Sequence, residues 1–120
     1  MDRTFKIGCR VIFFDSHRVA HEALVTNWFH SGPDGQTVAD YEQAYRDKGI
    51  TSPVWMPCCN VVWVSSDTDK KDHYGRQTER QSSCTYGRQQ GFLGNCWCWP
   101  DELEEAKQLA AKAYAEAVAR

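Results

Sequence analysis

Apolar residues gather in short runs separated by polar turns, and the first two runs have the spacing of paired strands. Residues 8–14 predict a short buried strand, and a polar connection at 15–18 joins it to a second strand at 20–29. Two such runs with a short turn between them predict a β-hairpin. Apolar residues occupy both alternating positions of the second run, so both faces of that strand carry apolar weight, as in the wall of a small closed barrel.

The middle of the chain interrupts this pattern. Ser, Gly and Pro open an insertion at about 31–52, within which helical spacing predicts a short helix at 37–48. Strands are predicted at 54–56 and 60–64, on either side of Pro57-Cys58-Cys59, where the proline indicates an edge or a bulge.

The last third holds a polar segment, a strand and a helix. Residues 65–83 are predominantly polar and predict a long loop, and long loops on small scaffolds usually bind something. A strand at 92–99 has strict Cys/Trp alternation, and Pro100 ends it. A helix at about 101–119 then begins with Asp101 and Glu104, the spacing of a capping box.

The predicted C-terminal helix has a narrow stripe made mostly of alanine: Leu103, Ala106, Ala110, Ala113 and Ala117. Such a stripe allows close approach to a surface but buries little area per residue. It predicts packing on the chain's own barrel or, alternatively, contact with a second copy or another subunit.

Length and composition limit the architecture and the partners. A chain of 120 residues fits one domain, which we assign to 1–120. The formal net charge of -2 lacks the broad positive field of a nucleic-acid-binding protein. The first residues do not resemble a signal peptide and no apolar run is long enough to cross a bilayer, so we expect a cytoplasmic protein with no membrane contact.

Six cysteines in such a protein predict thiols or metal ligands rather than disulfides. Cys96 and Cys98 point to the same face of their strand and are candidate zinc ligands together with Cys84. The C-x-x-C spacing typical of zinc knuckles is absent, and the alternative is buried thiols. We therefore expect no cofactor.

Trp97 and Trp99 lie on the opposite face from those cysteines, so one face of the strand is expected to display indoles. They predict either core packing or an aromatic shelf that stacks a ligand, which Tyr74 could join.

Arg76 and Arg80 are the strongest binding candidates in the polar segment, because guanidinium groups bind phosphate or carboxylate with two hydrogen bonds. The alternative is that they are solvated charges paired locally. Residues 74–77 spell Tyr-Gly-Arg-Gln, and residues 86–89 repeat these letters. The repeat predicts two similar turns, each presenting Arg with Gln; in the first turn these are Arg76 and Gln77.

Candidate chemistry for catalysis is sparse. The four histidines and six cysteines permit a Cys-His pair, but no nucleophile elbow, phosphate-binding loop or H-E-x-x-H motif is present. We expect no enzyme activity.

The block Asp72-His73-Tyr74-Gly75-Arg76-Gln77-Thr78-Glu79-Arg80, with Asn60 to Ser65 before it and Trp97 to Pro100 after it, resembles a group of small, mostly uncharacterised actinobacteriophage and prophage proteins. An S-V-x-H element follows the block in those proteins, whereas this chain reads Ser83-Cys84-Thr85-Tyr86. The resemblance implies a phage origin and an SH3-like barrel. With the residue pattern, it gives a mainly β fold with a short helical insertion and a C-terminal α-helix.

The leading functional expectation is a non-enzymatic binding module that contacts a protein partner or its own copies, in virion assembly or in interference with a host process or defence system. Its location is then the host cytoplasm or the virion. The alternatives are a binder of an anionic small molecule such as a nucleotide, with Arg76 and Arg80 on the phosphate, and a small zinc protein with Cys ligands.

Overall fold

The computed structural model describes residues 5–29, 47 and 58–119, and it begins with the predicted hairpin. Strand β1 (Arg10–Phe14) pairs antiparallel with β2 (Ala20–Phe29). The bounds of β2 match the prediction. The turn between the two strands is closed by Asp15, whose N–H donates to the Val19 carbonyl at 3.0 Å.

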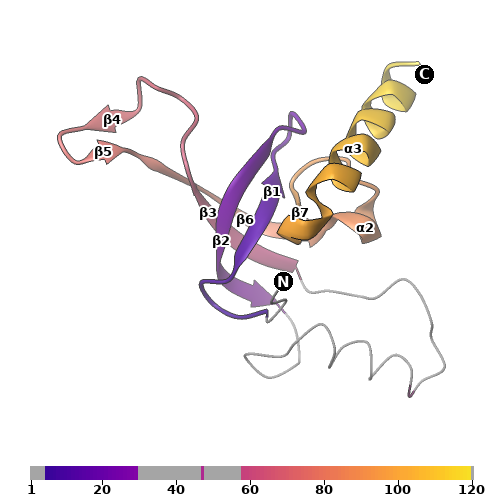
Figure 1. Cartoon of the computed structure of the whole chain (residues 1–120), viewed down its shortest axis with the longest axis horizontal. Helices are drawn as coiled ribbons and strands as arrows, with labels where there is room; N and C mark the ends of the chain where they lie inside the picture. Colours follow the sequence, from indigo (N-terminus) through magenta and orange to yellow (C-terminus); the bar gives the residue numbers. More distant parts are fainter. Residues whose placement is uncertain (1–4, 30–46, 48–57, 120) are drawn as a thin grey trace.

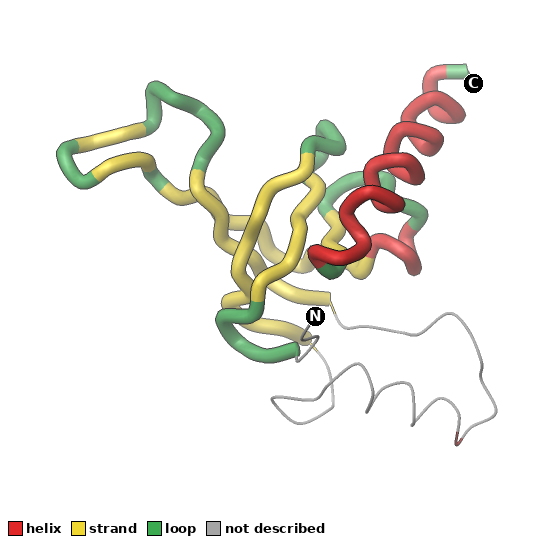
Figure 2. Tube along the Cα trace, viewed as in Figure 1, coloured by secondary structure: helices red, strands yellow, loops and turns green. Residues whose placement is uncertain are grey.

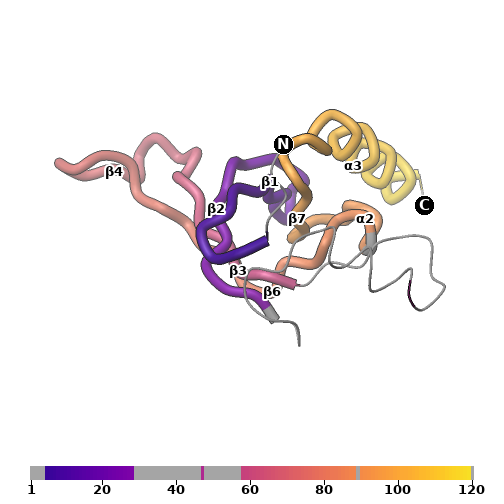
Figure 3. The backbone as a smooth tube through the Cα atoms, turned by 60° about the horizontal axis from the view of Figure 1, so that its bottom comes forward, coloured from indigo at the N-terminus to yellow at the C-terminus, as the bar shows by residue number. Residues whose placement is uncertain are grey.

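Five strands close into a barrel in the order β1-β2-β3-β6-β7, with β7 returning to β1 (Figures 1 and 3). The remaining three strands are β3 (Cys58–Val64), β6 (Thr78–Tyr86) and β7 (Cys96–Cys98). All neighbours are antiparallel except β6 and β7, which run parallel. The mainly β fold with a small closed, SH3-like barrel and a C-terminal helix is confirmed.

The barrel interior is filled by the residues that alternate inward along each strand. Strand register places Val11 opposite Ala23, Ala23 opposite Trp63, and Phe13 opposite Trp97, and all of them are buried. Aromatic side chains fill one end of this core, where the Phe5 ring lies 5.0 Å from Trp28, 5.1 Å from Trp97 and 6.0 Å from Trp99.

The C-terminal helix packs on its own barrel, which is the first of the two arrangements predicted for its alanine stripe. A 3-10 turn, η1 (Pro100–Glu102), leads into α3 (Leu103–Val118), which lies beside β1 and β7 (Figures 1 and 2). Ala106 and Ala110 are buried in the same core as the barrel. The second half of the helix extends past the strands, and Tyr114 and Val118 are exposed.

Several predicted boundaries were wrong. The last strand covers only Cys96–Cys98, because Phe92 and Asn95 have positive φ angles of 57° and 50° that turn the chain. Cys58 and Cys59 belong to β3 rather than to a connection. The helix does not begin at the expected capping box: its N-cap position is Glu102, the last residue of the 3-10 turn.

Two further sequence predictions have different outcomes. The insertion at about 31–52, with its helix, and the strand at 54–56 lie outside the described residues, apart from Asp47. The polar segment at 65–83 is only partly a loop, since its second half enters β6 and its middle forms β4 (Lys71–Asp72) and β5 (Gly75–Arg76). Among the described residues, no helix combines the length and apolarity needed to cross a bilayer.

Candidate binding surfaces

A two-stranded hairpin projects from the barrel between β3 and β6, and we call residues 66–77 the arm (Figures 1 and 3). Lys71 pairs with Arg76 in its short antiparallel ladder. Backbone hydrogen bonds continue toward the barrel: the Gln77 N–H donates to the Lys70 carbonyl, and the Ser65 N–H donates to the Gln77 carbonyl, both at 2.9 Å. The arm is therefore an ordered extension of β3 and β6.

The tip of the arm presents one aromatic side chain. Asp72 Oδ1 accepts the Tyr74 N–H at 2.8 Å, which fixes a tight turn. Gly75 has a φ of 119°, a conformation that favours glycine. This local geometry leaves the Tyr74 side chain on the outside, and 97% of the residue is exposed.

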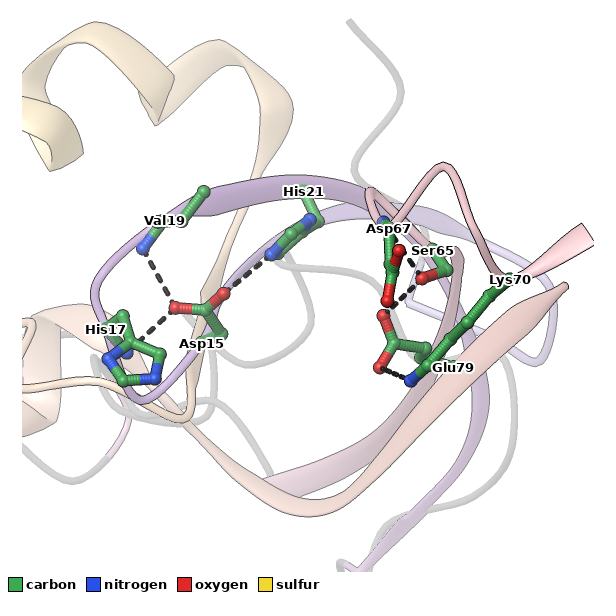
Figure 4. Close-up of polar contacts among 8 residues, drawn as sticks. All are labelled: Asp15, His17, Val19, His21, Ser65, Asp67, Lys70 and Glu79. Carbon is green, nitrogen blue, oxygen red and sulfur yellow. Dashed lines mark hydrogen bonds and ion pairs between the residues drawn. The ribbon is translucent and has the colours of Figure 1, made fainter. Parts of the chain in front are cut away.

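Hydrogen bonds brace the base of the arm (Figure 4). Ser65 is fully buried, and its Oγ donates to Glu79 Oε2 at 2.8 Å. Lys70 Nζ reaches Glu79 Oε1 at 3.4 Å, and Arg76 Nη1 donates to the Ser65 carbonyl at 3.4 Å. The hydrogen bond from Ser65, with the nearby Lys70 charge, lowers the pKa of Glu79 despite partial desolvation. An ionised Glu79, in β6, thus ties the base of the arm to the segment after β3 that carries Ser65 and Lys70.

The predicted binding residues divide between the arm, the barrel wall and the core. Tyr74, Arg76 and Gln77 are exposed on the arm. Arg80 is also exposed but lies on the barrel wall, opposite the outward-facing Val62 of β3. Arg80 therefore belongs to a different element from Tyr74, Arg76 and Gln77.

Of the two predictions for Trp97 and Trp99, core packing is confirmed and the aromatic shelf is wrong, because they are 0% and 1% exposed. Trp97 points into the barrel, and Trp99 packs against it with ring centroids 5.4 Å apart. The opposite face of β7 is buried too, since Cys96 and Cys98 are both 0% exposed. The expectation that one face of this strand displays indoles fails because both faces are covered. The nucleotide-binding alternative thereby loses these two side chains as base-stacking groups.

The two Tyr-Gly-Arg-Gln segments are not similar turns. The second begins at the end of β6 and enters α2 (Gly87–Gln90). Its Tyr86 is buried and donates its hydroxyl to Glu102 at 2.9 Å, while Arg88 forms ion pairs with Glu102 and Glu105. These bonds raise the pKa of Arg88, in spite of partial desolvation. The second segment is a structural corner, whereas the first is the tip of the arm.

The cysteines are buried thiols at the positions proposed for zinc. Burial raises the pKa of Cys84 and Cys98 to about 12 and that of Cys96 to about 11. Cys84 faces the barrel interior opposite Cys59, while Cys96 and Cys98 follow the outward side of β7 opposite Phe14 and Ile12. In the described part of the chain, no group of three or more His, Cys, Asp or Glu residues could hold a metal ion.

A polar pair that the sequence analysis missed lies at one end of the barrel (Figure 4). Asp15 Oδ2 contacts His21 Nε2 at 2.8 Å, and Oδ1 accepts the N–H groups of His17 at 2.8 Å and Val19 at 3.0 Å. Burial raises the pKa of Asp15, but these hydrogen bonds outweigh it and the net pKa is lowered. The signal was available only through strand register, which sets His21 opposite Phe13.

This Asp15–His21 pair borders a pocket of about 240 Å³ at the end of the barrel, which Trp63, Glu79 and Asn95 also line. Hydrogen bonds within the protein already engage both Asp15 oxygens, so the aspartate first of all organises the β1–β2 turn.

Comparisons with known proteins give no further assignment. The chain matches no protein-family model, and no curated protein or solved structure is detectably similar to it.

Proposed function

We propose that this protein is a non-enzymatic binding module that recognises a protein partner through its arm. The observation that carries the proposal is Tyr74, a large aromatic side chain that is 97% exposed at the tip of a hairpin braced by hydrogen bonds. An exposed tyrosine held in place on a projection is suited to entering a pocket on another protein.

The size of the expected contribution agrees with such a role. Burying one tyrosine in a partner pocket contributes roughly 2–4 kcal/mol, which is the range of an interface hot spot. Asp72 flanks the tip, and Arg76, whose Nη1 donates to the Ser65 carbonyl, has further guanidinium donors that can add directed polar contacts. Because Ser65, Lys70 and Glu79 fix the arm before binding, less conformational entropy is lost when the complex forms.

The resemblance to small actinobacteriophage proteins supports a partner drawn from the virion or from the infected cell. A role in assembly and a role in interference with a host process both require this kind of non-catalytic contact. The fold does not decide between them, because SH3-like barrels serve many functions.

Site-specific photocrosslinking tests the proposal. A benzophenone amino acid replaces Tyr74 in one variant and Leu93 in a control, since Leu93 is 55% exposed but lies outside the arm. After irradiation in an actinobacterial lysate, we expect one protein adduct from position 74 and none of that mass from position 93. An adduct of twice the chain's mass would identify a second copy as the partner.

Competition then distinguishes specific contact from random capture. Excess wild-type protein should suppress the adduct, whereas excess Tyr74→Ala should not, and Arg76→Ala should compete weakly. Leu93→Ala is the matched control and should compete as well as wild type. If Tyr74→Ala competes as well as wild type, the arm is not the recognition element.

A further inference from the structure

A second surface, remote in sequence from the arm, has the features of a ligand site. It is a groove of about 550 Å³ between α3 and the β1–β2 turn. Its volume lies within the range of about 300–1,000 Å³ that is typical of small-molecule sites. Its lining combines apolar side chains with basic ones, among them Phe14, Ala110, Ala111, Tyr114, Arg18 and Lys107.

The charge of this groove is one-sided. Arg18 and Lys107 carry full positive charges, and among the described residues no aspartate or glutamate lines the groove, although the chain as a whole has a net charge of -2. Two carboxylates lie beside the groove: Asp15 Oδ1 accepts the backbone N–H groups of His17 and Val19, and the exposed Glu104 lies 4.0 Å from Lys107 Nζ. Such a distribution favours an anionic ligand.

Arg18 is held in the groove in an unusual conformation. Its φ angle is +63°, in the left-handed region that a residue with a Cβ rarely adopts. The turn enforces this conformation, because the Arg18 N–H donates to the Asp15 carbonyl at 2.9 Å and the next residue, Val19, is bound by the Asp15 side chain. Backbone strain of this kind is often found at binding sites.

The guanidinium of Arg18 retains unused hydrogen-bonding capacity. It lies over the Tyr114 ring, with the central carbon 5.5 Å from the ring centroid. Its Nε is buried and has no acceptor among the described residues, and no carboxylate in that part of the chain pairs with it. Buried N–H groups are normally satisfied, so this one marks a position where an acceptor is favoured.

We propose that this groove binds a small amphiphilic anion, with a carboxylate or phosphate group on Arg18 and an apolar or aromatic body between Phe14, Ala110 and Tyr114. Lys107 adds a second positive charge at the rim. The site is separate from the arm and does not rest on the proposed function.

Three probes that share a naphthalene body test this proposal: 1-naphthoate, 1-naphthyl phosphate and the neutral 1-naphthamide. Binding is followed by two-dimensional amide NMR of the full chain. We expect saturable shifts at residues 14–20 and 107–114, with Kd values below about 1 mM for at least one anion and binding at least about tenfold weaker for the amide. The stronger of the two anions identifies the preferred head group.

Two substitutions separate the charge from the shape of the site. Arg18→Gln should weaken anion binding about tenfold and leave binding of the amide unaffected. Arg10→Gln is the matched control, because Arg10 lies on the outer barrel wall and pairs with Glu22. Ala111→Leu should fill the groove and weaken the binding of all three probes. This variant still tests the proposal if Arg18→Gln does not fold.

Three outcomes would overturn the proposal. These are equal affinity for the anions and the amide, shifts located outside the two segments, and anion binding that survives both Arg18→Gln and Ala111→Leu.

Discussion

The corner between β6 and α3 makes a quantitative prediction about stability. Glu102 is 5% exposed although it carries a charge. Its carboxylate accepts the Trp99 N–H at 2.9 Å and the Tyr86 hydroxyl at 2.9 Å, and it forms an ion pair with Arg88. Glu102→Ala removes the acceptor for all three groups at once.

The magnitude follows from the burial of those groups. A buried donor that loses its partner costs about 1–3 kcal/mol, and breaking a buried ion pair costs about 3–5 kcal/mol. The Arg88 side chain is 37% exposed, so water can replace part of its lost contact. We therefore expect Glu102→Ala to lower the free energy of unfolding by about 3 kcal/mol, a large part of the roughly 5–15 kcal/mol of a typical domain.

Urea denaturation measures this loss, and Glu105→Ala is the matched control. Glu105 contacts the same Arg88, but its side chain is 56% exposed, so its removal should cost no more than about 1 kcal/mol. Glu102→Gln should fall between the two, because it still accepts hydrogen bonds without the charge. Equal losses for Glu102→Ala and Glu105→Ala would refute the reasoning.

Three further predictions concern the turn, a thiol and a glycine. Asp15 has a lowered pKa in the folded state, so its contribution to stability exists above its unfolded value near 3.8 and is lost as the pH falls further. The difference in unfolding free energy between wild type and Asp15→Asn, measured by urea denaturation, should therefore shrink below about pH 4. A difference that stays constant with pH would contradict this. Cys84 is fully buried with a pKa of about 12. Iodoacetamide at about pH 8 should therefore label the partly exposed Cys58 at least about a hundredfold faster than Cys84, and this difference should vanish in urea. Equal labelling rates in the native protein, measured by mass spectrometry, would show that the core opens readily. A Cβ on Gly87 would lie 2.3 Å from the Phe92 ring, so Gly87→Ala should lower the melting temperature. Adding Phe92→Leu should partly restore the melting temperature in the double variant. If the losses in melting temperature of the two single variants simply add, the clash is not the cause.

The fold could be predicted well where the chain passes through the core. The alternation in β2 and the helix after Pro100 were readable, because burial imposes a period on the sequence. The arm was read as a loop because it stands away from the core: Lys71, Asp72, Gly75 and Arg76 have no apolar face to reveal their pairing.

The binding surfaces were harder to predict, because they depend on contacts between distant segments. The choice between core packing and a binding shelf for Trp97 could not be made from the sequence, because a single strand does not show that both of its faces are covered. The groove near Arg18 requires Tyr114 to lie beside it, and these residues are almost a hundred positions apart. Asp15 and His21 were likewise visible only once β1 and β2 were placed in register.

The closed barrel also limits the ways in which this chain can meet others. Every described barrel strand is paired on both sides, whereas β4 and β5 pair only with each other and so have open outer edges. Open edges invite strand addition and aggregation. Here each edge strand has only two residues, and Lys71, Asp72 and Arg76 place charges along them. The arm is thus built to discourage backbone pairing with other chains, and the selectivity of any complex it forms must come from its side chains.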